Sequence, residues 1–364
     1  MLNRARALSV LAGLLLFCAA GRAAGEDAVA KLDETLFLGK AVHVENVTVW
    51  PVYSNQPAPE GAKADYITLK EAQDQKLAEV RETGAGQGRG GEPGGQVNTV
   101  VIENKGTKPI LVLAGTLVRG GKQDRQVAQD FIIQPGKTAP VGAFCVEQGR
   151  WTATRAGQGT GGVFNGEEVL ANKDVRGGGQ FKNDQQEVWN KVALENAKGG
   201  NNPDSGTLMA STVEETDKDA LARREKTRNA IHAVLAEKAR QAQSPVGLAY
   251  AIDGKISEIR TFSDPRIFER YAKQLVNTIA NEGDLALRDA VTKKQEVFSK
   301  EADPNQAVEL VKNVEKQQKD QVASPSGNVN SYQKSADSSG ATLIPEEEKS
   351  KANPKPVSKT YQKH

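Results

Sequence analysis

Short runs of β-branched and other apolar residues, each ended by glycine, asparagine or proline, occupy residues 36–152. Residues 41–53 carry valine at positions 42, 44, 47, 49 and 52, which is typical of β-strands. Residues 97–103 and 110–114 are two further runs, and the segment between them is rich in turn-forming residues. Strands this short and regularly spaced predict an antiparallel, β-sandwich-like or barrel-like N-terminal part.

The pattern changes after Trp151. Residues 156–180 are rich in glycine and are predicted to form a loop. Residues 184–197 and 216–242 place apolar residues at helical spacing among many charged residues, which predicts two helices. The second half of the chain is therefore expected to be largely helical.

A second β-hairpin is predicted around Asp253 and Gly254, because this dipeptide favours a two-residue hairpin turn. Asp264 followed by Pro265 is a typical helix start, with an acidic N-cap and proline at the first helical position. Residues 184–300 are thus predicted to be a helical and hairpin part. Together with the β-rich segment, this predicts an α+β fold.

The last segment, residues 301–364, is rich in glutamine, lysine, serine and proline. Segments with few large apolar residues do not bury enough surface to offset the entropy of ordering the chain. We therefore expect a disordered, low-complexity polar tail.

The first 25 residues have the features of a secretory signal peptide. Arg4 and Arg6 form a short basic region, and an uncharged apolar run over residues 7–20 follows. Small residues then cluster near Ala23 and Gly25, where we expect cleavage. This predicts a secreted or periplasmic protein.

Two other membrane attachments are less well supported. Cys18 is a candidate lipoprotein anchor, but Phe17 precedes it where a small residue is required. The apolar run over residues 7–20 is too short to span a bilayer as a helix, and no later stretch is apolar enough. We expect no transmembrane segment.

The charge balance gives no sign of a nucleic-acid-binding protein, and the cysteine content argues against a disulfide-stabilised one. The chain has 48 lysine and arginine residues against 46 acids, and three of those arginines lie in residues 1–25. Without them the balance is about neutral, so nothing indicates a nucleic-acid partner. Loss of Cys18 with the signal peptide would leave Cys145 as the single cysteine, which excludes an internal disulfide.

None of the recognisable sequence motifs predicts a bound cofactor. Gly86, Gly88 and Gly91 have the spacing of a dinucleotide fingerprint, but a predicted strand follows where a helix is required. The chain contains three histidines, in unrelated contexts, so no metal site is predicted. We expect no cofactor and no metal.

Residues 114–125 combine a Gly-Gly pair with two arginines and a lysine, which suits an anionic ligand. The glycine pair exposes backbone amides, and arginines bind phosphates or carboxylates in a bidentate manner. A second segment about twenty residues later, residues 146–151, ends a predicted strand with the acid Glu147, the base Arg150 and the aromatic Trp151. If both segments close the same end of a sheet, the candidate ligand-binding residues are Arg119, Gly120, Gly121, Lys122, Gln123, Arg125, Arg150 and Trp151.

The same residues allow two other interpretations. Asp124 and Glu147 are candidate catalytic residues, as the acid–base pair of a hydrolase, if both face one cleft. Alternatively, the region is a charged hairpin loop whose arginine–aspartate pairs only hold its shape. No nucleophile or metal cluster accompanies the two acids, which favours binding over catalysis.

Four segments of the chain carry a resemblance to a known family: residues 115–125, 145–151, 188–192 and 247–279. They resemble a bacterial family, the ARG (ADP-ribosylglycohydrolase) and rhodanese-phosphatase-superfamily-associated protein domain. The resemblance covers roughly residues 35–300. The family's name implies an association with ADP-ribose and phosphate chemistry, but no activity or catalytic residue carries over to this chain.

These features predict an exported, noncatalytic binding domain for a nucleotide-like or sugar-phosphate ligand. A carboxylate-dependent hydrolase and a structural envelope protein are the alternatives. The expected partner is an anionic small molecule or a cell-envelope polymer. The identity of the ligand and the oligomeric state stay open.

Overall fold

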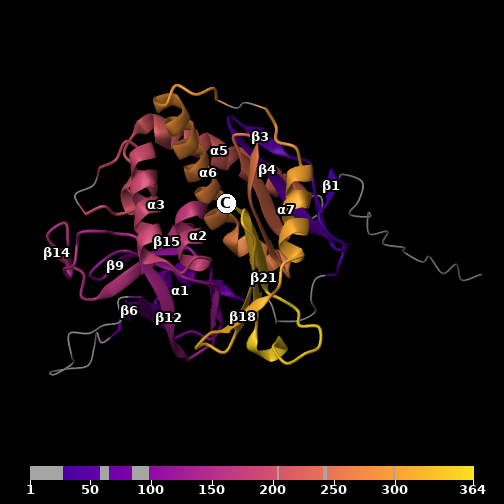
Figure 1. The fold of residues 1–364 in the computed structure, drawn as a ribbon. Helices are drawn as coiled ribbons and strands as arrows, with labels where there is room; N and C mark the ends of the chain where they lie inside the picture. The colour runs from indigo at the N-terminus through magenta and orange to yellow at the C-terminus, as the bar shows by residue number, and fades with distance from the viewer. Residues whose placement is uncertain (1–27, 58–64, 84–97, 203–204, 241–243, 298–299) are drawn as a thin grey trace, which may run out of the picture.

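The computed structural model describes residues 28–57, 65–83, 98–202, 205–240, 244–297 and 300–364. It contains a large open sheet and a small barrel, with helices beside and between them (Figure 1). The predicted signal peptide over residues 1–25, including Cys18, and the glycine fingerprint at Gly86, Gly88 and Gly91 lie outside the described residues. Among the described helices, none is both long and apolar enough to cross a membrane.

The large sheet is antiparallel and draws strands from both ends of the chain. Among the described residues its strand order is β1 (Ala30–Lys31), β2 (Leu36–Leu38), β4 (Val47–Ser54), β16 (Gly247–Ile252), β17 (Lys255–Phe262), β21 (Ser358–Lys363), β20 (Ser338–Ile344), β19 (Val329–Lys334) and β18 (Asp320–Ala323), with β3 (Val42–Val44) paired to β4. The predicted second hairpin is confirmed as β16 and β17. Asp253 and Gly254 have φ values of 51° and 72°, as a tight hairpin turn requires.

The barrel is built from the middle of the chain. Within the described part it closes in the order β10 (Arg125–Val127), β12 (Thr138–Cys145), β7 (Thr99–Asn104), β6 (Ala78–Glu82), β15 (Val163–Leu170) and β9 (Thr116–Gly120). Beside it lie a small sheet and a hairpin, formed by β11 (Phe131–Ile133), β8 (Ile110–Val112) and β5 (Ile67–Thr68), and by β13 (Thr154–Arg155) and β14 (Gln158–Gly159).

The α+β class is therefore confirmed; the sandwich-like arrangement is not confirmed, and a closed barrel is found among the described strands. The strands predicted within residues 36–152 separate into three structures, because β8 and β11 lie in the small sheet beside the barrel. Strands β2, β3 and β4 join the large sheet, whereas β6, β7, β9, β10 and β12 enter the closed barrel. Strand periodicity does not specify which strands pair, so all three structures produce the same local pattern.

The helices are α1 (Leu69–Asp74), α2 (Lys173–Gln180), α3 (Gln185–Lys198), α4 (Met209–Thr212), α5 (Lys218–Arg240), α6 (Pro265–Thr292) and α7 (Asn305–Glu315), with a short 3₁₀ helix at Glu346–Glu348. The start of α6 agrees with the sequence prediction. The Asp264 side chain accepts a hydrogen bond from the Arg266 amide, and Pro265 occupies the first turn.

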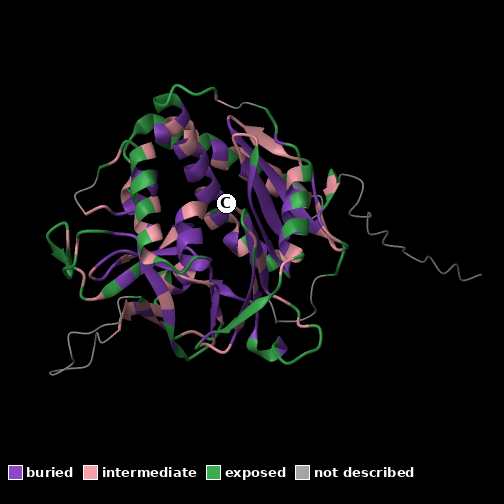
Figure 2. Cartoon of the chain, viewed as in Figure 1, coloured by how far each residue is buried: buried purple, intermediate pink, exposed green. Residues whose placement is uncertain are grey.

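The central strands of the large sheet, β4, β16, β17 and β21, are buried on both faces, as Figure 2 shows by the purple strands between helices, whereas the edge strand β18 is exposed. Along β16, Leu248 and Tyr250 belong to the core that includes the apolar side of α6. Ala249 and Ala251, on the opposite face, pack into the core beneath α7. Helix α6 also contacts Leu111 next to the barrel, so it connects the two β-structures.

The prediction of a disordered tail over residues 301–364 was wrong. This segment forms α7 and four strands, and β21 lies between β17 and β20 inside the large sheet. Its polar composition is compatible with a sheet because the backbone supplies most of the hydrogen bonds. A few apolar residues, Tyr332, Leu343 and Tyr361 among them, supply buried contacts.

The prediction of a glycine-rich loop over residues 156–180 was wrong from residue 163 onward. Residues 163–170 form β15 and residues 173–180 form α2. The glycines of α2 allow close packing. A Cβ at Gly179 would meet the Phe144 ring at 2.8 Å, and one at Gly178 would press on Val188 of α3 at 3.3 Å.

Candidate functional site

The Gly120-Gly121 pair turns the chain out of β9 toward β10, at one end of the barrel. Both residues have positive φ values, 137° and 47°. A Cβ at Gly120 would collide with the Val163 carbonyl oxygen, and one at Gly121 would collide with the Phe164 ring. Only glycine fits this close approach to β15.

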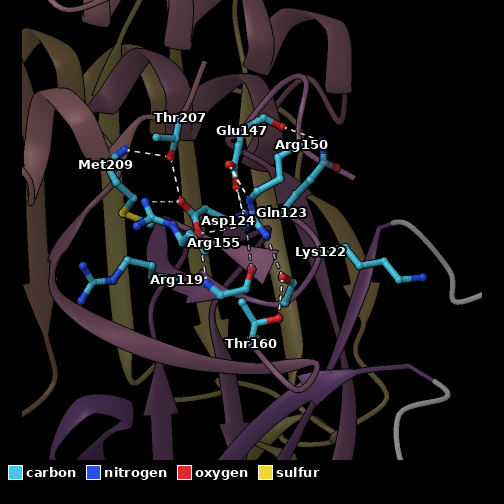
Figure 3. Close-up of polar contacts among 12 residues, drawn as sticks. Arg119, Lys122, Gln123, Asp124, Glu147, Arg150, Arg155, Thr160, Thr207 and Met209 are labelled. Carbon is cyan, nitrogen blue, oxygen red and sulfur yellow. Dashed lines mark hydrogen bonds and ion pairs between the residues drawn. The ribbon is translucent and has the colours of Figure 1, made fainter. Parts of the chain in front are cut away.

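The structure brings the two sequence-predicted segments together through Arg150 (Figure 3). Its Nε and Nη2 each donate to a Glu147 carboxylate oxygen at 2.7 Å. Its Nη1 and Nη2 also donate to the carbonyl oxygens of Gly121 and Gly120, at 2.9 and 3.1 Å. Arg150 therefore clamps the glycine turn to the end of β12, as a planar guanidinium is suited to do.

Asp124 and Glu147 lie inside this network, and both are buried. The oxygens of Asp124 accept from the Gly120 amide at 3.0 Å and from the Thr207 hydroxyl at 2.8 Å. The amide of Asp124 in turn donates to Glu147 at 2.8 Å. All four carboxylate oxygens of the two acids thus have partners from this chain.

Burial and the nearby charge of Glu147 raise the pKa of Asp124 above its ordinary 3.8, although Arg155 acts in the opposite direction. Nη2 of Arg155 lies 3.2 Å from the second Asp124 oxygen. The charged form of the Asp124 carboxylate is therefore stabilised by the nearby Arg155 guanidinium.

The remaining predicted residues divide between the interior and the surface. Arg125 is buried, and its Nη1 donates to the Cys145 sulfur at 2.7 Å. Gln123 is buried too and donates to the Glu147 carbonyl oxygen at 2.9 Å. Arg119 is partly exposed and forms ion pairs with Glu167 at 2.9 Å and with Glu214 at 3.5 Å.

Lys122 and Trp151 differ from these internally paired residues. Figure 3 shows the Lys122 side chain extending away from the network. Its ammonium nitrogen lies 5.6 Å from the centroid of the Trp151 ring, which is 50% exposed. In the described part of the chain, no carboxylate lies within ion-pair distance of Lys122.

Sequence reasoning missed three residues of the site, Arg155, Thr207 and Glu214. Nη1 of Arg155 pairs with Glu214 at 2.7 Å, which links the β13–β14 hairpin to the segment after α4. These residues lie far along the chain from Asp124, and no local pattern identifies such contacts. Arg155 follows Trp151 by only a few residues in the sequence, and this closeness was the one feature that could have pointed to it.

Among the described residues, no group of three or more histidine, cysteine, aspartate or glutamate side chains could hold a metal ion. The cluster's cations are instead matched by acids: Arg119, Arg125, Arg150 and Arg155 each lie beside at least one carboxylate. Chemically, the arrangement is a neutralised network that fixes a loop, with one cation and one aromatic ring left at its surface.

Residues 35–351 match the sequence profile of the ARG and Rhodanese-Phosphatase-superfamily-associated Protein domain. The chain belongs to this family. The match extends beyond the roughly 35–300 span of the sequence resemblance and includes α7 and β18–β20, in agreement with their folded state. No curated protein and no solved structure matches the chain. The family description records an association and assigns no activity.

Proposed function

We propose that this protein is an exported, noncatalytic binding domain for an anionic ligand of nucleotide-like or sugar-phosphate chemistry. The signal-peptide pattern of residues 1–25 supports export. The observation that carries the ligand proposal is the position of the Lys122 ammonium, 5.6 Å from the centre of the half-exposed Trp151 ring.

An exposed indole beside a lysine suits a ligand that combines a flat or apolar ring with a negative charge. Stacking on an aromatic side chain tolerates many bases and sugars, and the ammonium attracts phosphate. Arg125 is buried beside Cys145 and does not reach such a ligand. The proposed contacts are therefore Trp151 and Lys122.

The internal network supports binding by fixing this surface in advance. The Lys122 amide donates to Glu82 at 2.7 Å, and Arg150, next to Trp151, is held by Glu147 and the glycine turn. A rigid loop loses little conformational entropy when a ligand binds. The role proposed for Arg150 is consequently to position the loop.

The hydrolase alternative has less support. Asp124 and Glu147 are buried, and each of their carboxylate oxygens already accepts a bond from this chain. A general acid or base has to reach a substrate atom at hydrogen-bond distance. The geometry therefore favours a structural role for both acids.

The proposal is tested by calorimetric titration of the full mature chain with AMP and with ribose 5-phosphate, using adenosine as the uncharged comparison. We expect Trp151→Ala to weaken AMP binding at least about tenfold, since one stacked base contributes ~1–3 kcal/mol. Lys122→Ala should weaken AMP binding to a similar extent through loss of a charge-assisted contact to the phosphate. Trp151→Phe should retain most of the affinity because it keeps an aromatic face.

Lys316→Ala, at an exposed lysine after α7, is the matched control and should bind like the wild type. If neither anionic probe binds the wild-type protein, the proposal fails and a structural envelope role is favoured. Equal affinity for adenosine and AMP would remove the anionic part of the proposal.

A further inference from the structure

A separate cleft of about 360 Å³ lies at the C-terminal end of the chain. Figure 1 shows the chain end near the centre of the molecule, close to α2, α6 and α7. Residues from α2, α3, α6 and the β16–β17 hairpin line the cleft, together with Lys363 and His364. None of its lining residues belongs to the Arg150 network.

The floor of this C-terminal cleft, meaning its buried polar lining, includes several hydrogen-bond acceptors beside the Ser257 hydroxyl. Asn172, Glu195 and Glu282 are 2%, 5% and 7% exposed. The Asn172 amide nitrogen donates to Glu195 at 2.7 Å, but its Oδ1 has no hydrogen-bond partner among the described residues. A buried acceptor of this kind is normally satisfied, so a donor from a ligand or a water is expected there.

Glu282 adds a second buried carboxyl to the floor. It accepts from the Lys173 amide, at the start of α2, at 2.6 Å and from the Tyr250 hydroxyl at 2.8 Å. Burial raises its pKa, although the charges of Arg176 and Lys173 act in the opposite direction. Carboxyl and amide oxygens together favour a ligand that presents hydroxyl groups.

The rim of the cleft is basic. Lys173, Lys198, Lys255 and Lys363 line it, against the acids Asp174, Glu195 and Glu282. Lys198 pairs with Glu195 at 2.7 Å, whereas the ammonium of Lys255 has no carboxylate partner in the described part of the chain. An excess of cations above an acceptor-lined floor suits a ligand with one anionic group.

Size and shape narrow the ligand class further. A volume of about 360 Å³ is at the small end of ligand pockets, which suits a monosaccharide better than a dinucleotide. Ile252, Ile256 and Ala286 supply a short apolar wall for the carbon face of a ring. The described lining has no tryptophan, tyrosine or phenylalanine, and its imidazole, His364, already packs against Phe181 at 6.4 Å between ring centroids, which leaves little stacking surface for a base.

We infer that this cleft binds a small sugar carrying one anionic group, either a phosphate or a carboxylate. The sugar hydroxyls donate to Asn172 Oδ1 and to the floor carboxyls. The anionic group contacts Lys255 at the rim. This site is independent of the Trp151–Lys122 surface and adds a second binding site to the protein.

The test is calorimetric titration of the full chain with ribose 5-phosphate, glucuronate, ribose and inorganic phosphate. We expect the two anionic sugars, or one of them, to bind at least tenfold more tightly than ribose or phosphate alone. Lys255→Ala should weaken binding about tenfold through loss of a charge-assisted contact. Ala286→Phe should block the cleft without removing a polar group.

Lys137→Ala, at an exposed turn of the barrel, is the matched control for Lys255→Ala. Thermal melting shows whether Ala286→Phe still folds, and Lys255→Ala tests the site without altering the core. Unchanged affinity in Lys255→Ala and in a folded Ala286→Phe overturns the inference. Phosphate binding as tight as that of either sugar, or no binding of any probe, overturns it as well.

The same probes separate this inference from the proposed function. Trp151→Ala should leave binding of anionic sugars to the cleft unchanged. If Trp151→Ala abolishes ribose 5-phosphate binding while Lys255→Ala does not, the cleft inference is overturned and the proposed function is supported.

Discussion

At the scale of single residues, arginine side chains in this protein mainly serve internal structure. Arg150 contacts Glu147 with two nitrogens and the glycine turn with two more bonds, and its side chain is 10% exposed. A residue type chosen from sequence for anion recognition thus binds the chain's own carboxylates. The predicted charged hairpin, with arginine–acid pairs holding its shape, describes Arg150 better than ligand contact does.

Arg150→Ala should destabilise the fold by about 3 kcal/mol, because it leaves the buried Glu147 carboxylate without its cation. Arg150→Lys should recover only part of that loss, since an ammonium lacks the forked geometry. Urea unfolding measures both. Loss of stability no larger than that of Lys122→Ala would show that the clamp contributes little.

Glu214 provides a pH-dependent contribution to stability. Burial acts to raise its pKa, but Arg155 and Arg119 outweigh this effect and lower it below 4.5. A lowered folded-state pKa stabilises the fold above about pH 4.5, and this stability is lost as the pH falls through the folded pKa. Glu214→Gln should therefore lower the melting temperature at pH 7, and the difference should shrink toward pH 3.

Glu301→Gln, at an exposed position, is the control for that series and should change little at any pH. Melting curves between pH 3 and pH 7 give the comparison. A difference for Glu214→Gln that grows as the pH falls would contradict the assigned direction.

At the scale of elements, the sequence predicted correctly those turns and helix starts that neighbouring residues determine by themselves. The Asp253-Gly254 turn and the Asp264-Pro265 start of α6 are both confirmed. Strands β18–β21 were missed because their alternation is carried by serine, threonine and glutamine, which resemble a solvated segment. Their order comes from successive pairing, with β21 on β17, β20 on β21, β19 on β20 and β18 on β19, which composition does not encode.

Thr360→Pro should prevent stable folding, because β21 is an interior strand and proline removes a ladder donor. Thr360→Val, which keeps the backbone donor and a branched side chain, should fold. Far-UV circular dichroism and limited proteolysis distinguish the two variants. A folded, protease-resistant Thr360→Pro protein would mean that β21 is dispensable.

At the scale of the whole molecule, α6 connects the sheet to the barrel. Tyr271 of α6 lies in one core with Leu248 of the sheet and Leu111 beside the barrel. The candidate site depends on similar long-range contacts, such as Thr207 to Asp124. Sequence reasoning identified the two segments that Arg150 joins, but contacts across this distance depend on the complete fold.

This shared core predicts one cooperative unfolding transition for sheet and barrel together. Urea curves followed by circular dichroism and by tryptophan fluorescence should coincide, since Trp50 lies in the sheet and Trp151 next to the barrel. Two separated transitions would show that the β-structures are independently stable.

The central claim is that an anionic ligand binds against Trp151 and Lys122. The chain contains three tryptophans, which give three indole N–H signals in a nitrogen–proton NMR spectrum, and Trp151→Phe assigns one of them. Titration with AMP should shift the Trp151 signal and leave those of Trp50 and Trp189 in place. An unmoved Trp151 signal at saturating AMP would contradict the account.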